Sequence, residues 1–173
     1  MPNDTDDTLP ASPADVLRRL DELGIQSRTV SHPPVYTVEE AKALRGELSG
    51  AHIKNLFLRN KKGAMWLVVC QEDRTVDLKA LAAALDAGRF SFGSAERLMT
   101  YLGVEPGSVT PLAVINDRGR QVQVVIDTAV LAQAPVHCHP LTNDMTTAIA
   151  PDDLVRFLEA EGHPPRLLDM TGL

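Results

Sequence analysis

A chain of 173 residues, 44% of them apolar and 4% aromatic, has the size and composition of one mixed α/β domain rather than of a fibrous or disordered protein. Its net charge of −6 excludes broad, sequence-blind binding to nucleic acid, because neutralising phosphates requires a basic surface, so a nucleic-acid partner must be held locally. The two cysteines stand far apart, and no run near the N-terminus resembles a signal peptide or a membrane span, so we expect a cytoplasmic protein with no membrane partner.

The N-terminal part of the chain divides into a polar tail and the start of the fold. Residues 1–12 are too polar to fold alone and are expected to form a flexible tail, which leaves 13–173 as a single domain. After Pro13 the apolar residues recur at helical spacing, and Gly24 supplies a C-terminal cap, so this segment predicts a helix. A short strand is expected at 25–30.

The next segment predicts a short helix and a hairpin. The sequence His-Pro-Pro at 32–34 interrupts regular structure, and Thr37 with Glu40 forms a capping box for a short helix over 41–44. Two β-prone runs between 52 and 70 flank the polar sequence Asn-Lys-Lys-Gly, which is typical of a β-hairpin.

The middle of the chain alternates between helical and extended patterns. Helices are predicted at 77–85 and 94–102, with a short strand at 89–92 between them. The apolar runs 112–115 and 122–126 are separated by Asn-Asp-Arg-Gly, which predicts a second hairpin.

The C-terminal part adds strands at 136–139 and 146–149 and a final helix that begins at Pro151 and ends before Gly162. Strands and helices are interspersed without a regular strand-helix-strand order, which favours an α/β fold with a mixed sheet flanked by helices. The chain lacks both common glycine-rich phosphate loops, so we expect neither nucleotide hydrolysis nor dinucleotide redox chemistry, and no cofactor.

Lys54 is the first candidate for chemistry. In a strand its side chain shares a face with Leu56 and Leu58. On the core side its ammonium group would need an anion, a carbonyl or water, which a substrate pocket would provide. A lysine that extends to solvent from the strand end fits the same pattern, so the residues alone leave both interpretations open.

A second candidate is the loop at 103–111, which holds two glycines and two prolines directly before an apolar run. Such a loop is stiff and tightly turned, and a glycine such as Gly107 can let backbone amides approach a ligand oxygen, as an oxyanion site requires. An ordinary helix-to-strand connection has the same composition, so the alternative stays open.

His137 and His139 lie two residues apart and therefore share one face of a strand. We expect no metal there, because no third ligand and no recognised ligand spacing accompany them. Cys138 between them points to the opposite face, so it is not expected to act as a nucleophile with a histidine base.

Basic residues gather at the tip of the first hairpin, where Arg59, Lys61 and Lys62 are candidates for contact with the phosphates of a nucleic acid. A solvated surface explains the same cluster. A looser set could also contribute, namely Arg18, Arg19, Arg28 and Arg45.

Five motifs in chain order carry the most specific signal in the sequence, and the match that they carry covers roughly 32–170. They are His-Pro-Pro-Val-Tyr-Thr-Val-Glu-Glu-Ala from His32, His-Ile-Lys-Asn-Leu-Phe-Leu from His52, Ser-Phe-Gly-Ser from Ser91, the G-x-x-x-P loop from Gly107 to Pro111, and His-Pro-Leu-Thr-Asn from His139. In this order they resemble the YbaK-type aminoacyl-tRNA deacylases, a family that includes the insertion domain of bacterial prolyl-tRNA synthetase and its free-standing relatives.

The resemblance implies a curved mixed sheet flanked by helices, and roles for particular residues. It places Lys54 on the functional lysine of the family, which would hold the terminal phosphate or the substrate near the pocket. It places Gly107 in the loop that binds the substrate carbonyl. The implied substrate-binding residues are Ser108, Val109, Thr110, Pro111, His139 and Asn143.

The activity that the resemblance implies is trans-editing, in which water deacylates mischarged alanyl-tRNA(Pro) without a side-chain nucleophile and with help from the terminal ribose hydroxyl. Mischarged tRNA(Pro) is then the expected partner, and prolyl-tRNA synthetase is a candidate second partner. The alternatives are a cysteinyl-tRNA(Pro) deacylase of the same family and a non-catalytic module that binds tRNA or a synthetase. Asp144 and Met145 depart from the Asn-Thr-Ala-Thr-Thr pattern of the alanyl-tRNA(Pro) deacylases and could alter the pocket wall.

Overall fold

The computed structural model describes residues 10–45 and 49–173, apart from the side chains of 44 and 45. Its helices are α1 (Pro13–Glu22), α2 (Val38–Arg45), α3 (Leu78–Ala84), α4 (Ala95–Leu102), α5 (Thr128–Leu131) and α6 (Pro151–Ala160), with the 3₁₀ helices η1 (Pro106–Ser108) and η2 (Pro111–Asn116). Its strands are β1 (Ser27–Ser31), β2 (Ala51–Arg59), β3 (Met65–Gln71), β4 (Ser91–Phe92), β5 (Val122–Asp127), β6 (Val136–Cys138), β7 (Met145–Ile149) and β8 (Arg166–Leu168).

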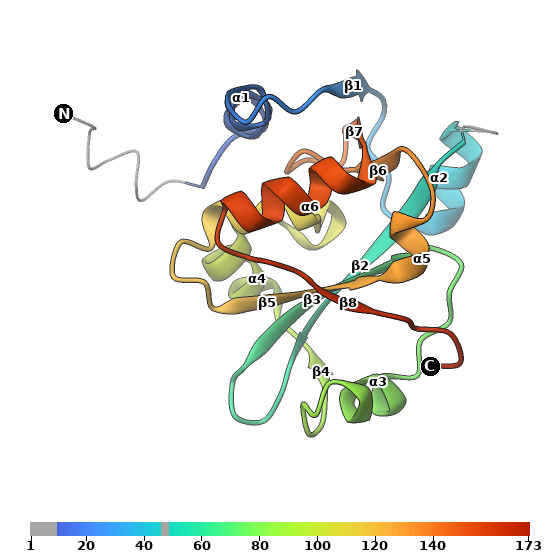
Figure 1. Ribbon diagram of the computed structural model, residues 1–173, viewed down its shortest axis with the longest axis vertical. Helices are drawn as coiled ribbons and strands as arrows, with labels where there is room; N and C mark the ends of the chain where they lie inside the picture. Colours follow the sequence, from blue (N-terminus) through green and yellow to red (C-terminus); the bar gives the residue numbers. More distant parts are fainter. Residues whose placement is uncertain (1–9, 46–48) are drawn as a thin grey trace.

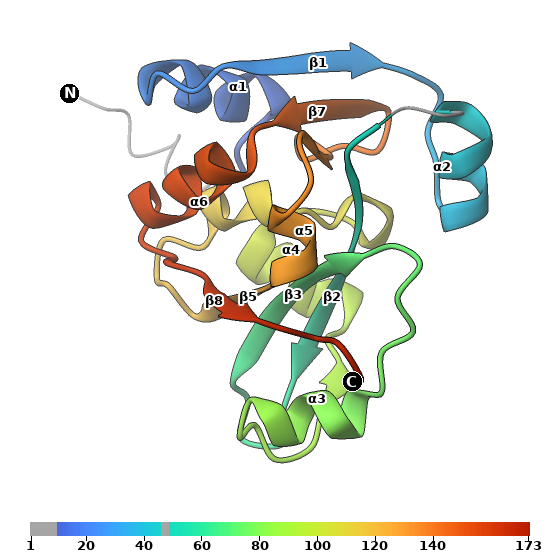
Figure 2. The ribbon, with the colours of Figure 1, turned by 45° about the vertical axis from the view of Figure 1, so that its right-hand side comes forward.

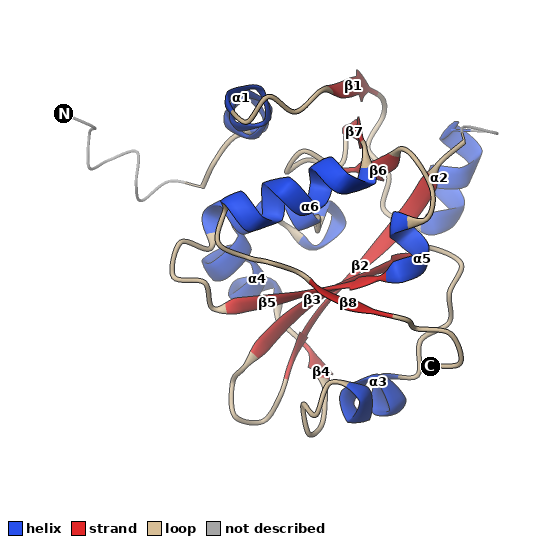
Figure 3. Cartoon of the chain, viewed as in Figure 1, coloured by secondary structure: helices blue, strands red, loops and turns tan. Residues whose placement is uncertain are grey.

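The strands of this described part form one eight-stranded mixed sheet in the order β1-β7-β6-β2-β3-β5-β8, with β4 paired to β2 (Figure 3). Pairing is antiparallel for β1 with β7, β6 with β7, and β2 with β3. It is parallel for β2 with β6, β3 with β5, and β5 with β8. The expected mixed sheet flanked by helices is therefore confirmed.

The central strands bury both of their faces. One face packs with α1, α4 and α6 in the larger core, which includes Leu67, Val69 and Phe157. The other face packs with α3 and the C-terminal segment in a smaller core around Leu58, Val68 and Met170. Figures 1 and 2 show α1 and α6 on one side of these strands and α3 on the other. Within the described residues, every helix is too short or too polar to traverse a lipid bilayer.

Local signals form the helices where the sequence predicts them. Ser94 accepts a hydrogen bond from the Arg97 amide at the start of α4, and Gly103 ends that helix in the left-handed conformation at φ 64°. At α2 the hydroxyl of Thr37 accepts from the amide of Glu40, while the Glu40 carboxylate accepts from the amide of Tyr36.

The second predicted hairpin is wrong. Residues 111–116 form η2 instead of a strand, because Pro111 starts the helix and the Thr110 hydroxyl caps it by accepting from the Leu112 amide. β5 then pairs in parallel with β3 and β8. A short, fully buried apolar run does not distinguish a strand from a buried helix, since both faces of either element would be apolar.

A buried pair joins η2 to the end of α6. Asp117 and His163 are 3% and 4% exposed, and His163 Nε2 lies 2.8 Å from Asp117 Oδ2. The other ring nitrogen, Nδ1, lies 2.9 Å from the Glu161 carbonyl. The Asp117 carboxylate also accepts from the amides of Gln121 and Val122, so it closes the turn that leads into β5.

Three features were not predicted. They are β8, α5 and the place of Ala11 and Ser12, which the sequence analysis assigned to a tail. Ser12 caps α1, and the Ala11 amide donates to Asn116 Oδ1 at 2.7 Å, so both residues belong to the folded domain. Residues 1–9 of that tail lie outside the described part of the chain.

Candidate active site

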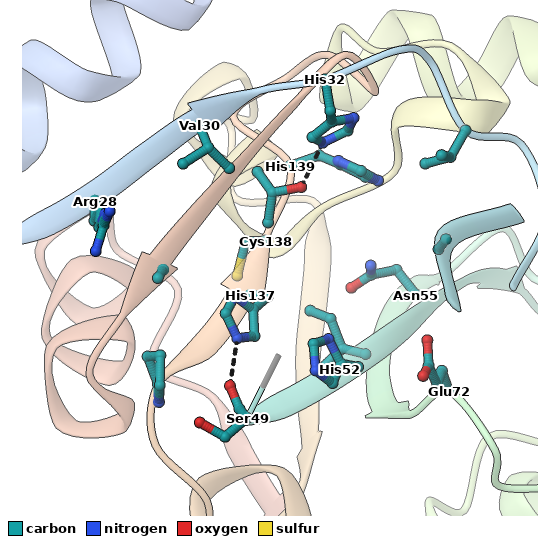
Figure 4. Close-up of a pocket in the computed structure, with 16 residues that line it drawn as sticks. Arg28, Val30, His32, Ser49, His52, Asn55, Glu72, His137, Cys138 and His139 are labelled. Carbon is teal, nitrogen blue, oxygen red and sulfur yellow. Dashed lines mark hydrogen bonds between the residues drawn. The ribbon is translucent and has the colours of Figure 1, made fainter. Parts of the chain in front are cut away.

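A cavity of about 520 Å³ opens where β1, β6 and β7 meet the first half of β2 and helix α2 (Figure 4). Its lining includes four of the five histidines of the chain, namely His32, His52, His137 and His139. Apolar side chains complete much of the wall, among them Val30, Val35, Ile53 and Ala148. A cavity with an apolar wall and a few polar groups is the usual form of a small-molecule site.

His139 presents a hydrogen-bond acceptor to this cavity. Its Nδ1 lies 2.9 Å from the main-chain carbonyl of Met145, and because a carbonyl only accepts, Nδ1 carries the proton. Burial lowers the pKa of His139 by more than the hydrogen bond to Met145 raises it, and the nearby His32 lowers this pKa further. The ring is therefore neutral at pH 7, with its lone pair on Nε2.

His32 stands beside His139, with the ring centroids 6.4 Å apart. Its Nδ1 donates to the Pro33 carbonyl at 2.8 Å, and its Nε2 lies 2.7 Å from the Thr146 hydroxyl. Both ring nitrogens are thus held within the protein, which makes His32 a rigid part of the wall.

His52 and His137 form the other histidine pair, at the end of the cavity near Ser49 (Figure 4). They are register partners on β2 and β6, and their rings stack at 4.6 Å with an interplanar angle of 4°. The Nε2 of His137 donates to the Ser49 carbonyl at 2.9 Å. Within residues 10–45 and 49–173, no three His, Cys, Asp or Glu side chains are grouped to hold a metal ion.

Asn55 is a candidate functional residue that the sequence analysis did not single out. Its Nδ2 donates to the Val109 carbonyl at 3.1 Å, which joins β2 to the glycine-containing loop. Its Oδ1 is buried and has no hydrogen-bond partner among the described residues. Asn55 lines the cavity, so this unpaired acceptor lies in the cavity wall, where it is covered and lacks a partner in the described part of the free protein. The available signal was a polar residue between Ile53 and Phe57, on the strand face opposite Lys54.

The loop predicted to bind the substrate lies against the cavity wall. A Cβ at Gly107 would come within 3.0 Å of the Tyr36 ring and 3.2 Å of Asn143 Nδ2, so the backbone here approaches its neighbours closely. Asn143 is buried and donates from Nδ2 to the Val35 carbonyl at 2.9 Å. Asn143 therefore links the loop to Val35, which lines the cavity.

The side chains that follow Gly107 build the loop itself. Ser108 and Thr110 are buried, and Thr110 caps η2, which begins at Pro111. Val109 packs against the larger core while its carbonyl accepts from Asn55. Direct contact between these side chains and a substrate stays a prediction. Of the residues predicted to bind the substrate, His139 does line the cavity.

Lys54 shares a strand face with Leu56 and Leu58 and does not line the cavity, although His52, two residues before it on the same face, does. Leu56 and Leu58 belong to the smaller core, whereas the next residue, Asn55, lines the cavity. The ammonium group donates to the main-chain carbonyl of Arg74. It therefore holds the loop after β3, whose residue Glu72 lines the cavity, and its role in binding substrate stays a prediction.

We expect Lys54→Met to lower kcat/KM for a mischarged tRNA at least about tenfold, because one hydrogen bond to a charged phosphate contributes roughly 1.5–3 kcal/mol. Methionine preserves the apolar stem, so the melting temperature should change little. The matched control is Lys79→Met on the exposed surface of α3. Parent-like turnover in Lys54→Met would reduce Lys54 to a structural link to Arg74.

The basic patch proposed for tRNA lies far from the cavity. Lys61 and Lys62 are exposed in the turn after Arg59, at the end of β2 opposite to the cavity. Lys61 is six positions after Asn55 along an extended segment, which corresponds to about 20 Å. Contact between tRNA and this patch stays a prediction.

The thiols of Cys70 and Cys138 are both buried. Burial raises the pKa of Cys138 to about 12 and that of Cys70 to about 11. Cys138 lies on the cavity wall but is 2% exposed and packs in the larger core. Both thiols keep their protons at neutral pH, so neither has the thiolate character that a nucleophile requires.

Residues 32–157 match a family model described as the aminoacyl-tRNA editing domain, and this range contains the four cavity histidines and Asn55. The chain is 36% identical over 156 residues to the prolyl-tRNA editing protein ProX of Acetoanaerobium sticklandii, a match that covers 90% of this chain and 95% of that protein. It is 39% identical over 163 residues to the prolyl-tRNA synthetase associated domain-containing protein 1 of Danio rerio, covering 91% of this chain and 89% of that protein.

A solved structure described as a candidate trans-editing enzyme for prolyl-tRNA synthetase has a TM-score of 0.70 at 20% identity, over 92% of this chain and 97% of that one. At this identity the likeness supports the fold. The family match and the relatives confirm the resemblance to YbaK-type deacylases and the expectation of an aminoacyl-tRNA deacylase. This chain belongs to the aminoacyl-tRNA editing domain family.

Proposed function

We propose that this protein is a trans-editing hydrolase that removes alanine from mischarged alanyl-tRNA(Pro). The observation that carries the proposal is the cavity in which the neutral His139 and the unpaired Asn55 Oδ1 lie beside the Gly107 loop. This arrangement offers acceptors for substrate donors. The names of the relatives support prolyl-tRNA editing as the process.

The proposed reaction uses water as the nucleophile. The aminoacyl ester is already activated, so the enzyme needs a positioned water and donors for the developing oxyanion. The oxygen of the water attacks the carbonyl carbon, the ester bond breaks, and the terminal ribose oxygen leaves with a proton. His139 Nε2 accepts a hydrogen bond from the water or from the neighbouring ribose hydroxyl, and backbone amides around Gly107 face the oxyanion.

An editing site separate from the synthetase site is needed because the synthetase alone does not separate proline from smaller amino acids well enough. A synthetase pocket that fits proline cannot strongly reject the smaller alanine, because a missing methylene changes binding by only about 1–3 kcal/mol. An editing cavity that holds alanyl and excludes prolyl esters completes the selection. Prolyl-tRNA synthetase is in this scheme the source of the mischarged tRNA and a candidate partner.

Asp144 and Met145, the two residues that depart from the alanyl-specific pattern, contribute to the site through their main-chain carbonyl groups. The Asp144 carbonyl accepts from the His32 amide at 2.9 Å, and the Met145 carbonyl accepts from His139 Nδ1 at 2.9 Å. Neither side chain is part of the cavity lining. Any residue other than proline supplies these same carbonyl and amide groups, so Asp144 and Met145 are compatible with an alanyl-specific pocket.

The decisive measurement is deacylation of alanyl-, cysteinyl- and prolyl-tRNA(Pro) by the purified protein, with and without a chelator. We expect hydrolysis of alanyl-tRNA(Pro) at least about tenfold faster than of the other two, in line with the discrimination that a methylene-sized difference allows. The chelator should leave the rate unchanged. Faster hydrolysis of cysteinyl-tRNA(Pro) would reassign the substrate. Binding of tRNA without hydrolysis of any ester would identify a binding module instead.

A further inference from the structure

An exposed aromatic side chain directly follows a residue of the cavity wall in the chain. Tyr36 is 71% exposed, and its chain neighbour Val35 is buried and lines the cavity. Among the large apolar side chains that are exposed in the described residues, the only other aromatic one is Phe92, on β4 near the far end of β2. Of these two exposed aromatic residues, Tyr36 is the one that is adjacent in the chain to a residue of the cavity wall.

The backbone that carries this ring is held on both sides. The Tyr36 amide donates to the Glu40 carboxylate at 3.1 Å, at the start of α2. On the other side, Val35 exchanges hydrogen bonds with Asn143, at 2.9 and 3.4 Å. The ring itself is exposed, so its position is set by the backbone and its face is free to bind a ligand.

The ring also lies directly against the loop that is proposed to face the ester carbonyl. A Cβ at Gly107 would be 3.0 Å from Tyr36 Cδ1 and 3.2 Å from Cε1. Glycine at this position lets the aromatic ring come next to the loop backbone. A substrate whose carbonyl sits at Gly107 therefore has Tyr36 within reach of the group attached to its ester oxygen.

The size of the cavity agrees with a ligand larger than an amino acid. About 520 Å³ falls within the range of roughly 300–1,000 Å³ that is typical for ligands of drug size, whereas an alanyl group fills only a small part of it. The cavity can thus admit the aminoacylated end of the tRNA, including its ribose, and the base attached to that ribose must lie at or beyond the rim.

We propose that Tyr36 is the stacking platform for the terminal nucleobase of the tRNA, an assignment that rests on the proposed editing function. Unpaired bases in RNA are commonly bound by stacking on aromatic side chains, and such stacking contributes roughly 1–3 kcal/mol per base. Stacking on Tyr36 places the ribose ester at Gly107 and leaves the amino acid inside the cavity. The phenolic hydroxyl is not required for this interaction.

The kinetic test compares Tyr36→Ala and Tyr36→Phe with Phe92→Ala, the matched control with an exposed aromatic ring away from the cavity. On alanyl-tRNA(Pro), Tyr36→Ala should raise KM about tenfold with kcat little changed, while Tyr36→Phe and Phe92→Ala behave as the parent. On an alanyl ester of methyl riboside, which has no base, Tyr36→Ala and the parent should have equal kcat/KM. An unchanged KM on tRNA, or an equal loss on the ester without a base, would overturn the assignment.

A binding test separates this inference from the proposed function. The probe is an oligonucleotide that carries no amino acid and ends in two cytidines and 2-aminopurine. Stacking of the 2-aminopurine base lowers its fluorescence, so the measurement does not require deacylation. The parent, Tyr36→Phe and Phe92→Ala should quench it, and Tyr36→Ala should not. Quenching that survives in Tyr36→Ala and disappears in His137→Ala would assign the base to the stacked histidine pair instead. A parent that quenches the probe but hydrolyses no ester would refute the editing activity and leave the platform standing.

Discussion

Replacing Asn55 with alanine is expected to lower kcat/KM for alanyl-tRNA(Pro) about 100-fold, the largest loss that we expect from a single side chain of the cavity. Two interactions disappear together. The first is the hydrogen bond from Nδ2 to the Val109 carbonyl, which holds the loop containing Gly107. The second is the acceptor Oδ1, which is buried and unpaired in the free protein.

The donor that we assign to Oδ1 is the α-ammonium group of the alanyl ester, because it is the charged donor closest to the reacting carbonyl. Hydrogen bonds to charged groups contribute roughly 1.5–3 kcal/mol, which corresponds to a factor of about 10 to 150. A propionyl ester of the same tRNA lacks this ammonium group. It should therefore lose much less activity than the alanyl ester when Asn55 is replaced.

The matched control for this experiment is Asn60→Ala. Asn60 also donates from Nδ2 to a main-chain carbonyl, that of Ala87, and its Oδ1 accepts from the Ala64 amide, but it lies in the turn at the far end of β2. Its replacement should affect stability and leave kcat/KM of the folded protein unchanged. If Asn55→Ala retains more than about half of the parental kcat/KM, the buried acceptor has no part in binding the substrate.

The largest expected effect on stability comes from Asp117→Ala. The substitution leaves His163 buried without its carboxylate partner, and breaking a buried pair on one side costs roughly 3–5 kcal/mol. It also removes the acceptor for the amides of Gln121 and Val122 at the start of β5. For a domain of this size, we expect the melting temperature to fall by about 6–20 °C.

Thermal unfolding followed by circular dichroism measures this effect. The control is Asp152→Ala, an exposed carboxylate in the first turn of α6, which should change the free energy of unfolding by less than about 0.5 kcal/mol. At temperatures where Asp117→Ala is folded, its rate of deacylation should equal that of the parent. A fall in melting temperature of less than about 2 °C would mean that the pair between Asp117 and His163 contributes no net stability.

The same pair gives the stability a dependence on pH. Burial by itself would raise the pKa of Asp117, but hydrogen bonds from His163, Val122 and Gln121 outweigh it, so the pKa lies below its usual value of 3.8. A carboxyl with a depressed pKa in the folded state stabilises the protein above its unfolded pKa. This contribution is lost as the pH falls below about 4, through the folded value. Asp117→Asn should therefore reduce the acid sensitivity of the melting temperature.

Local signals predicted the elements that depend on neighbours in sequence. Ser94 and Gly103 bound α4, and a polar turn joins β2 to β3, because capping and tight turns are decided within a few residues. β8 had no such signal, since its three residues are held by parallel pairing to β5 across some 40 residues of chain. The buried run after Pro111 had an apolar pattern that fits two different elements.

The candidate site, too, could be predicted only where it depends on residues that are close in the sequence. The period of two placed Lys54 and Asn55 on opposite faces of one strand, which is correct, but the sequence does not say which face borders a cavity. That depends on where β6, β7 and β1 lie next to β2, and these contacts join distant segments. The motifs led to the lysine, whereas the geometry leads to its neighbour Asn55, whose donor and acceptor lie between the cavity and the loop.

The protonated thiol of Cys138 has a consequence for an enzyme that binds activated esters. A thiolate on this wall could attack the carbonyl carbon of the alanyl ester, which would release the tRNA and leave the amino acid on the protein as a thioester until water hydrolysed it. Burial keeps the proton on the sulfur and makes this part of the wall chemically inert. A buried thiol that keeps its proton does not capture the amino acid, so an amino acid that enters as an ester can leave as a free acid.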